Sequence, residues 1–191
     1  MKEQLQKDFD NSIKNLSLSQ KDIEIKKFCL DNFIDKGFPN RKEEDWKFSD
    51  LNQIIKNNIG ELSFYNDQAS TNKVDTSVFV DGLEHNKIVF INGRIEKIDF
   101  EYEKKDQIEI IDQSETINEF ENSNSLSDLN NAFTNKCFKI LVKKGYQLAK
   151  PLIIYHTTNS KIWSKNINLR LNFELDKDLS LIHISEPTRL D

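Results

Sequence analysis

Residues 87–98 read KIVFINGRIEKI, and this stretch carries the clearest structural signal in the sequence. Two mostly apolar, β-branched runs flank Asn92 and Gly93. Both central positions of a tight hairpin turn need a positive φ, which asparagine and glycine tolerate best. The stretch therefore predicts a β-hairpin.

Strand patterns return after residue 136. In residues 167–175 (INLRLNFEL), apolar side chains at odd positions alternate with polar ones, as in a strand with one buried face. Residues 138–142 and 151–155 are apolar runs of strand length, and residues 107–112 are a further candidate strand. The intervening residues 113–126 have the composition of a loop, and residues 127–133 could form a short helix.

The first 60 residues have helical spacing instead. Four apolar side chains recur every three or four residues on one face: Leu5, Phe9, Ile13 and Leu16. A second helix is predicted to begin after an N-cap at Ser19 and to end at Gly37. A third, short helix is predicted from a cap at Ser49 to about Gly60. Helices first and strands later predict an α+β fold.

The composition excludes several classes of protein. The 191 residues carry 27 Lys and Arg against 32 Asp and Glu, a net charge of −5, which argues against a dedicated nucleic-acid binder. The two cysteines make no disulfide framework and no Cys/His metal spacing. Neither a secretory signal nor a run of about 18 apolar residues is found. The sequence predicts a soluble, cytoplasmic protein with no membrane partner.

The last residues, 179–191, differ in character from the rest of the chain. Residues 179–189, LSLIHISEPTR, look like the translation of a sequencing-library adaptor. We therefore expect residues 179–191 to be non-native and exclude them from fold reasoning. The alternative is a natural surface tail. If the tail is non-native, the chain could be the front part of a longer protein.

A charged run, residues 38–51 (FPNRKEEDWKFSDL), stands out near the third predicted helix. The structural interpretation places Trp46 in the helical core, with Arg41 and Glu44 paired or solvated at its rim. We prefer this interpretation to a catalytic role.

This run resembles the N-terminal signature of the SufD family, subunits of the SUF iron–sulfur cluster assembly scaffold. Seven residues fill the places of that signature: Arg41, Glu44, Trp46, Lys47, Phe48, Ser49 and Leu51. Two more stretches resemble the family in the same order, residues 88–94 and residues 129–152. The sister family SufB resembles residues 41–51 less closely.

The resemblance implies a helical N-terminal region, followed by a right-handed parallel β-helix and a C-terminal helical domain. We accordingly predict a helical region over residues 1–80, a hairpin and linker over 81–135, and the first rungs of a truncated β-helix over 136–178. A core in such a fold forms only when several rungs stack. A chain that ends after the first rungs should therefore express poorly or self-associate.

The resemblance also implies a function. The chain would be a non-catalytic scaffold subunit that pairs with a SufB-like subunit and works with a SufC-like ATPase. The iron–sulfur cluster would form transiently in the complex, with no cofactor held by this fragment. Because the family's functional residues lie further along the chain, no catalytic, cofactor-binding or metal-binding residue is predicted here.

The remaining chemical candidates have structural explanations. Cys29 is spaced for packing in a helical core, and Cys137 has no second thiol or histidine nearby in sequence. His85 is predicted to be solvated in a loop, and His156 to have a structural or exposed role. No phosphate-binding glycine loop occurs, so the chain itself should not bind ATP.

Two other functions stay open at this point. The first is a carbohydrate-active β-helix enzyme, which needs carboxylates grouped on adjacent rungs; strand 167–175 offers Glu174 alone. The second is a helical adaptor, which predicts no strand after residue 136.

Overall fold

The computed structural model describes residues 2–14, 16, 18–58, 62–64, 73–113, 124–159, 162 and 165–175. In this part of the chain the helices are α1 (Lys2–Lys14), α2 (Gln20–Lys36), α3 (Leu51–Asn58) and α4 (Ser125–Phe133), with short 3-10 turns at Glu44–Trp46 and Thr76–Val78. The strands are β1 (Asn86–Ile91), β2 (Arg94–Asp99), β3 (Ile108–Asp112), β4 (Lys136–Val142), β5 (Leu152–Thr157) and β6 (Leu169–Leu175). The predicted α+β class is confirmed.

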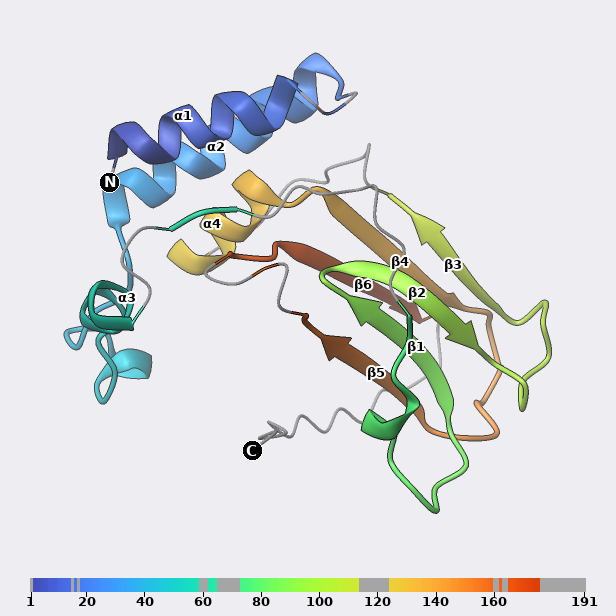
Figure 1. The fold of residues 1–191 in the computed structure, drawn as a ribbon. Helices are drawn as coiled ribbons and strands as arrows, with labels where there is room; N and C mark the ends of the chain where they lie inside the picture. Colours follow the sequence, from blue (N-terminus) through green and yellow to red (C-terminus); the bar gives the residue numbers. More distant parts are fainter. Residues whose placement is uncertain are drawn as a thin grey trace.

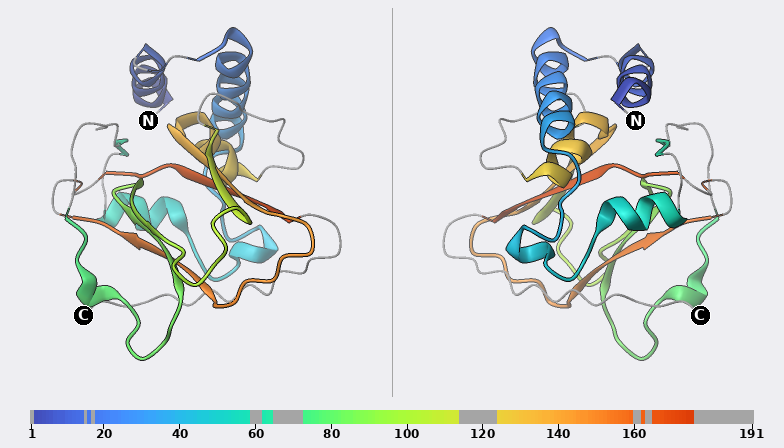
Figure 2. Two further views of the ribbon diagram at one scale, coloured as in Figure 1. Left: turned by 90° about the vertical axis from the view of Figure 1, so that its right-hand side faces the viewer. Right: turned by 90° about the vertical axis from the view of Figure 1, so that its left-hand side faces the viewer.

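The strands form two mixed sheets of three strands, in the orders β2-β1-β5 and β3-β4-β6 (Figure 1). In each sheet the central strand has one antiparallel and one parallel neighbour. Side chains from both sheets share one apolar cluster, which includes Ile88 and Phe90 of β1 and Phe138 and Ile140 of β4. Helices α1, α2 and α4 gather on one side of the sheets (Figure 2).

The prediction of a truncated right-handed parallel β-helix over residues 136–178 is wrong. The described residues form two small mixed sheets, and each contains an antiparallel pair, β1 with β2 and β3 with β4. Period-two alternation specifies which face of a strand is buried but not which strand lies beside it. Residues 179–191, where we predicted a non-native tail, lie outside the described residues.

The predicted hairpin is confirmed as the pair β1–β2. Asn92 and Gly93 both have positive φ, at 53° and 79°. A Cβ on Gly93 would lie 2.6 Å from Cγ2 of Ile167, so the turn also needs glycine because the chain before β6 packs against it. The register of the pair shifts between Val89 and Phe90, as at a β-bulge.

The predicted start and end of the second helix agree with the structure, whereas the predicted end of the third helix near Gly60 lies outside the described residues. The Ser19 side chain accepts a hydrogen bond from the backbone N–H of Asp22, and Gly37 ends α2 with its N–H on the Phe33 carbonyl oxygen. The third helix is capped differently. Its cap is Asp50, whose carboxylate accepts from the Gln53 N–H at 3.1 Å, and not Ser49.

The helices form a second core. Its buried side chains come from α1, α2, α4 and the segments between them: Leu5, Phe9, Cys29, Leu30, Phe33, Phe38, Leu62, Ala132 and Phe133. Phe9 meets Phe133 edge to face, with ring centroids 6.0 Å apart. The short helix α4 runs directly into β4, so it connects this core to the sheets.

Candidate functional site

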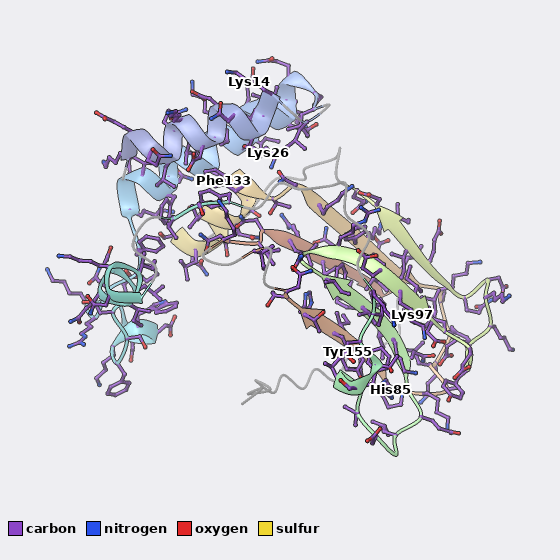
Figure 3. The ribbon with its side chains drawn as sticks, in the orientation of Figure 1. Lys14, Lys26, His85, Lys97, Phe133 and Tyr155 are labelled. Carbon is purple, nitrogen blue, oxygen red and sulfur yellow. The ribbon has the colours of Figure 1, made fainter. Side chains whose placement is uncertain are left out.

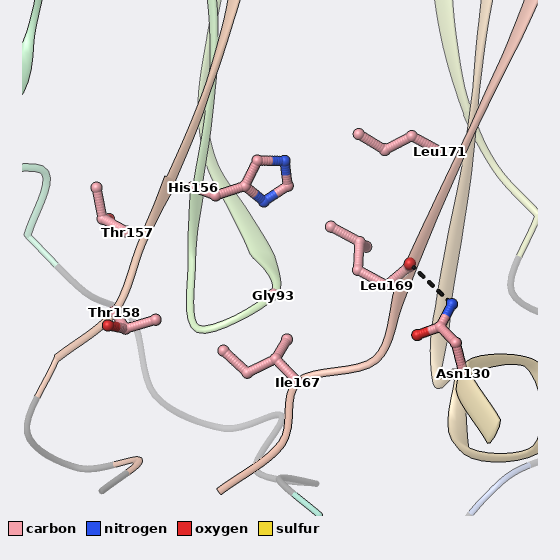
Figure 4. Close-up of a pocket in the computed structure, with 8 residues that line it drawn as sticks. All are labelled: Gly93, Asn130, His156, Thr157, Thr158, Ile167, Leu169 and Leu171. Atoms are coloured by element: carbon pink, nitrogen blue, oxygen red, sulfur yellow. Dashed lines mark hydrogen bonds between the residues drawn. The ribbon is translucent and has the colours of Figure 1, made fainter. Parts of the chain in front are cut away.

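A cavity of about 410 Å³ opens between the two sheets. It lies among the edge strands β5 and β6, the β1–β2 turn and α4 (Figure 4). Its described lining comprises Gly93, Asn130, His156, Thr157, Thr158, Ile167, Leu169 and Leu171. None of these eight residues is a carboxylate, a thiol or an amine, so the lining offers apolar contact and a few hydrogen-bonding groups.

His156 is the titratable group of this cavity, and its imidazole lies over the ring of Phe90. The two rings are nearly parallel, at 4°, with centroids 4.9 Å apart. Burial lowers the pKa of His156 below its ordinary value, so the neutral imidazole dominates at pH 7. Opposite it, the Asn130 side chain donates to the Leu169 carbonyl oxygen at 3.3 Å. This arrangement agrees with the structural or exposed role predicted for His156.

The most connected polar group is Glu103, which sequence reasoning did not single out. Its carboxylate accepts hydrogen bonds from Asn86 Nδ2 and the Tyr146 hydroxyl, both at 2.6 Å, and from the backbone N–H groups of Ala149 and Lys150. Burial by itself would raise the pKa of Glu103. The hydrogen bonds outweigh that effect and hold the pKa below its ordinary value.

Glu103 thereby fastens the loop between β4 and β5 to the start of β1. All its partners donate to the carboxylate, and Glu103 does not line the cavity between the sheets. We interpret this network as structural. No local pattern in the sequence could have revealed it, because Asn86 and Ala149 lie 17 and 46 residues away from Glu103.

His85 is buried, with 2% of its surface exposed, so the prediction of a solvated loop histidine is wrong. Its Nδ1 donates to the Leu83 carbonyl oxygen at 2.6 Å, and its Nε2 accepts from the Tyr155 hydroxyl at 2.7 Å. That hydroxyl accepts in turn from the Val80 N–H at 3.1 Å. Figure 3 shows His85 and Tyr155 together at one end of the sheets. The chain of bonds holds residues 80–85 against β5.

Lys26 is a second buried group that the sequence did not reveal. Its Nζ donates to the backbone carbonyl oxygens of Asn131, Ala132 and Thr134, the last at 2.6 Å, at the C-terminal end of α4 (Figure 3). A positive charge is favourable there because the last carbonyls of a helix lack partners. Burial nevertheless lowers the pKa of Lys26 to about 8.

Both cysteines are buried, as predicted for Cys29. Burial raises the pKa of the Cys29 thiol to about 11 and also raises the pKa of Cys137. Protonated thiols are poor nucleophiles and poor metal ligands. Among the described residues, no three His, Cys, Asp or Glu side chains are grouped to hold a metal ion.

The charged run 38–51 is a surface segment whose two ends contact the helical core. Phe38 and Leu51 belong to the helical core or pack against it. Trp46 is only partly buried and is not among the described side chains of that core, so the prediction that it packs there is wrong. Phe48 is 90% exposed, with Lys47 Nζ 5.5 Å from its ring centroid. Arg41 and Glu44 are exposed, in agreement with the prediction.

Comparisons with known protein families and with curated proteins find no match to this chain. None of the described helices is long and apolar enough to cross a membrane.

Proposed function

We propose that this chain is a non-catalytic scaffold subunit for iron–sulfur cluster assembly of the SUF type. It would pair with a SufB-like subunit and work with a SufC-like ATPase in the cytoplasm, with the cluster forming transiently in the complex. The proposal rests on the three SufD-like motifs and their order. It does not depend on a β-helix, which the described residues do not form.

One observation favours a binding role for the first motif. In residues 41–51 the aromatic side chain of Phe48 is 90% exposed, and Lys47 lies beside it. Large exposed aromatic side chains are typical of residues that become buried in protein interfaces. The other two motifs form parts of the fold: residues 88–94 build the hairpin, and residues 129–133 belong to α4.

The alternative functions have less support. A helical adaptor predicts no strand after residue 136, yet β4, β5 and β6 all lie there. A carbohydrate-active enzyme would need Glu174 as an acid or base, and Glu174 is ion-paired with Lys139. The β-helix that suggested this enzyme class is also absent from the described residues.

The proposal is tested by co-expressing the tagged 191-residue chain with SufB-like and SufC-like subunits of the same genome. We expect both subunits to co-purify with the wild-type chain, and Phe48→Ser to reduce the yield of the complex. The matched control is Phe28→Ser, an exposed aromatic on α2 outside the motif. Failure of the wild-type chain to retain either subunit would refute the proposal, whereas equal losses in both variants would refute the role of Phe48.

A further inference from the structure

The two sheets end in four edge strands: β2 and β5 in one sheet, and β3 and β6 in the other. Each has one strand neighbour among the described residues. An edge strand presents backbone groups that can pair with another chain, and natural proteins often block such pairing with charges or bulges. The charge pattern of each edge therefore indicates whether pairing is blocked or favoured.

Strand β6 reads LRLNFEL and carries opposite charges at equal distances from Asn172. Arg170 lies two residues before this centre and Glu174 two residues after it. When two copies of a strand pair antiparallel about a two-fold axis, the residue two before the centre faces the residue two after it. Arg170 of each copy would then face Glu174 of the other.

We propose that β6 is a self-association edge, at which a second copy of this chain pairs antiparallel about Asn172. Two Arg–Glu pairs would flank the axis on the polar face of the strand. Opposite charges directly across an antiparallel pair are stabilising, and like charges are destabilising. Closed two-fold pairing of this kind would join the β3-β4-β6 sheets of the two copies into one continuous sheet.

The other edges are less suited to pairing with a second copy. Strand β2 also has opposite-charge registers, with Arg94 facing Glu96 about Ile95 or Lys97 facing Asp99 about Ile98. Its pairing with β1, however, contains a register shift, and an irregularity of this kind is one of the features that block edge pairing. Strand β3 carries the acidic Glu109 and Asp112 and no basic residue. Strand β5 has no Lys, Arg, Asp or Glu, so its charges neither favour nor oppose pairing.

The apolar face of β6 also gains from a second copy. Phe173 is 40% exposed, and Leu171 lines the cavity between the sheets. In the proposed register, Leu171 of one copy lies opposite Phe173 of the other. The pairing would therefore cover an exposed aromatic side chain at the open side of the sandwich, a favourable burial of apolar surface.

Contacts within the chain place the pairing on residues 170–174. At the start of β6 the Asn130 side chain donates to the Leu169 carbonyl oxygen, and Asn166 bridges to Phe64 just before the strand. Arg170 Nε donates to Asn172 Oδ1 at 3.1 Å, which positions the guanidinium on the polar face. Glu174 is paired with Lys139, but 56% of its side chain remains exposed and its carboxylate can accept a second partner.

The test is sedimentation velocity of the 191-residue chain over a range of concentrations, with the variants Arg170→Glu and Glu174→Arg. The wild-type chain should show a concentration-dependent dimer. Each variant alone sets like charges opposite each other at both contacts, and its dimer dissociation constant should rise at least about tenfold. An equimolar mixture of the two variants restores both opposite-charge contacts and should recover the dimer.

Recovery in the mixture also shows that both variants fold, since unfolded chains would not form the complementary pair. The matched control is Glu109→Arg on the opposite edge of the same sheet, which should leave dimerisation unchanged. A monomeric wild-type chain, variants that dimerise as well as the wild type, or a mixture that stays monomeric would each overturn the proposal.

Discussion

At the scale of single residues, the polar groups that matter most are buried and paired. Glu103 accepts hydrogen bonds from two side chains and two backbone N–H groups. His85 is hydrogen-bonded to the Leu83 carbonyl oxygen and to the Tyr155 hydroxyl, which in turn accepts from the Val80 N–H. Buried polar groups of this kind are costly when any partner is removed. Their positions therefore tell us more about stability than about catalysis.

The Glu103 network predicts a specific loss in Glu103→Gln. The amide replaces one acceptor oxygen with a donor that faces Tyr146, Asn86 or a backbone N–H, so the free energy of unfolding at pH 7 should fall by about 1–3 kcal/mol. Urea denaturation measures this loss. Glu109→Gln, an exposed carboxylate on β3, is the control and should change stability little.

The same variant has a predicted pH dependence. The pKa of Glu103 is lower in the folded chain than its ordinary value of 4.5, so its stabilising effect is present above pH 4.5 and is lost as the pH falls through the folded pKa. The difference between wild type and Glu103→Gln should therefore shrink in acid. A difference that stays constant down to acid denaturation would contradict an ionised Glu103.

At the scale of elements, the β1–β2 turn depends both on its own backbone conformation and on the packing of a distant segment. Asn92 and Gly93 supply the positive φ values of the turn, while Ile167, outside the hairpin, fills the space beside Gly93. The hairpin signal in the sequence explains the first property. The second depends on the packing of a segment more than 70 residues away.

Two variants distinguish the cost of a positive φ from the cost of the contact with Ile167. Gly82→Ala meets nothing within 4 Å and should cost only the strain of positive φ, about 1–2 kcal/mol. Gly93→Ala has a similar φ but also brings Cβ to 2.6 Å from Ile167, so it should cost about 1–3 kcal/mol more. Chemical denaturation of both variants checks this order. Equal losses would show that the contact with Ile167 relaxes without cost.

At the scale of the whole molecule, Lys26 ties the helical core to the sheets. It reaches from α2 to the last carbonyls of α4, just before the chain enters β4. A lysine whose pKa is lowered on folding destabilises the folded state while it stays charged, and this cost fades as the pH rises through the folded pKa.

The free energy of unfolding of the wild-type chain should accordingly rise between pH 7 and pH 9. The rise should exceed that of Lys26→Met by about 1 kcal/mol, because the folded pKa of Lys26 is about 8 and the ordinary value is 10.5. The comparison is limited to pH values up to about 9. Above that pH the raised pKa of Cys29 lowers the free energy of unfolding, because the ordinary pKa of a thiol is 9.0. Urea midpoints at the two pH values measure the effect. Lys27→Met, an exposed neighbour, should keep the wild-type rise; a rise that persists in Lys26→Met would assign it to another group.

The sequence by itself determined the features that depend on neighbouring residues. Ser19 and Gly37 bound α2, Asn92 and Gly93 turn the hairpin, and the alternation around Asn172 predicts β6. Each of these rests on backbone conformation or on side-chain period within a few residues, so it is readable without the fold.

Only the tertiary structure decided which strands pair and which polar groups are buried. The partner of β6 is β4 and that of β5 is β1, so the expected stack of β-helix rungs gives way to two mixed sheets. Lys26 meets carbonyls about a hundred residues away, and His85 meets Tyr155 at a separation of 70. Local periodicity carries no information about contacts at such distances, because burial of apolar surface is not directional and accepts many partners.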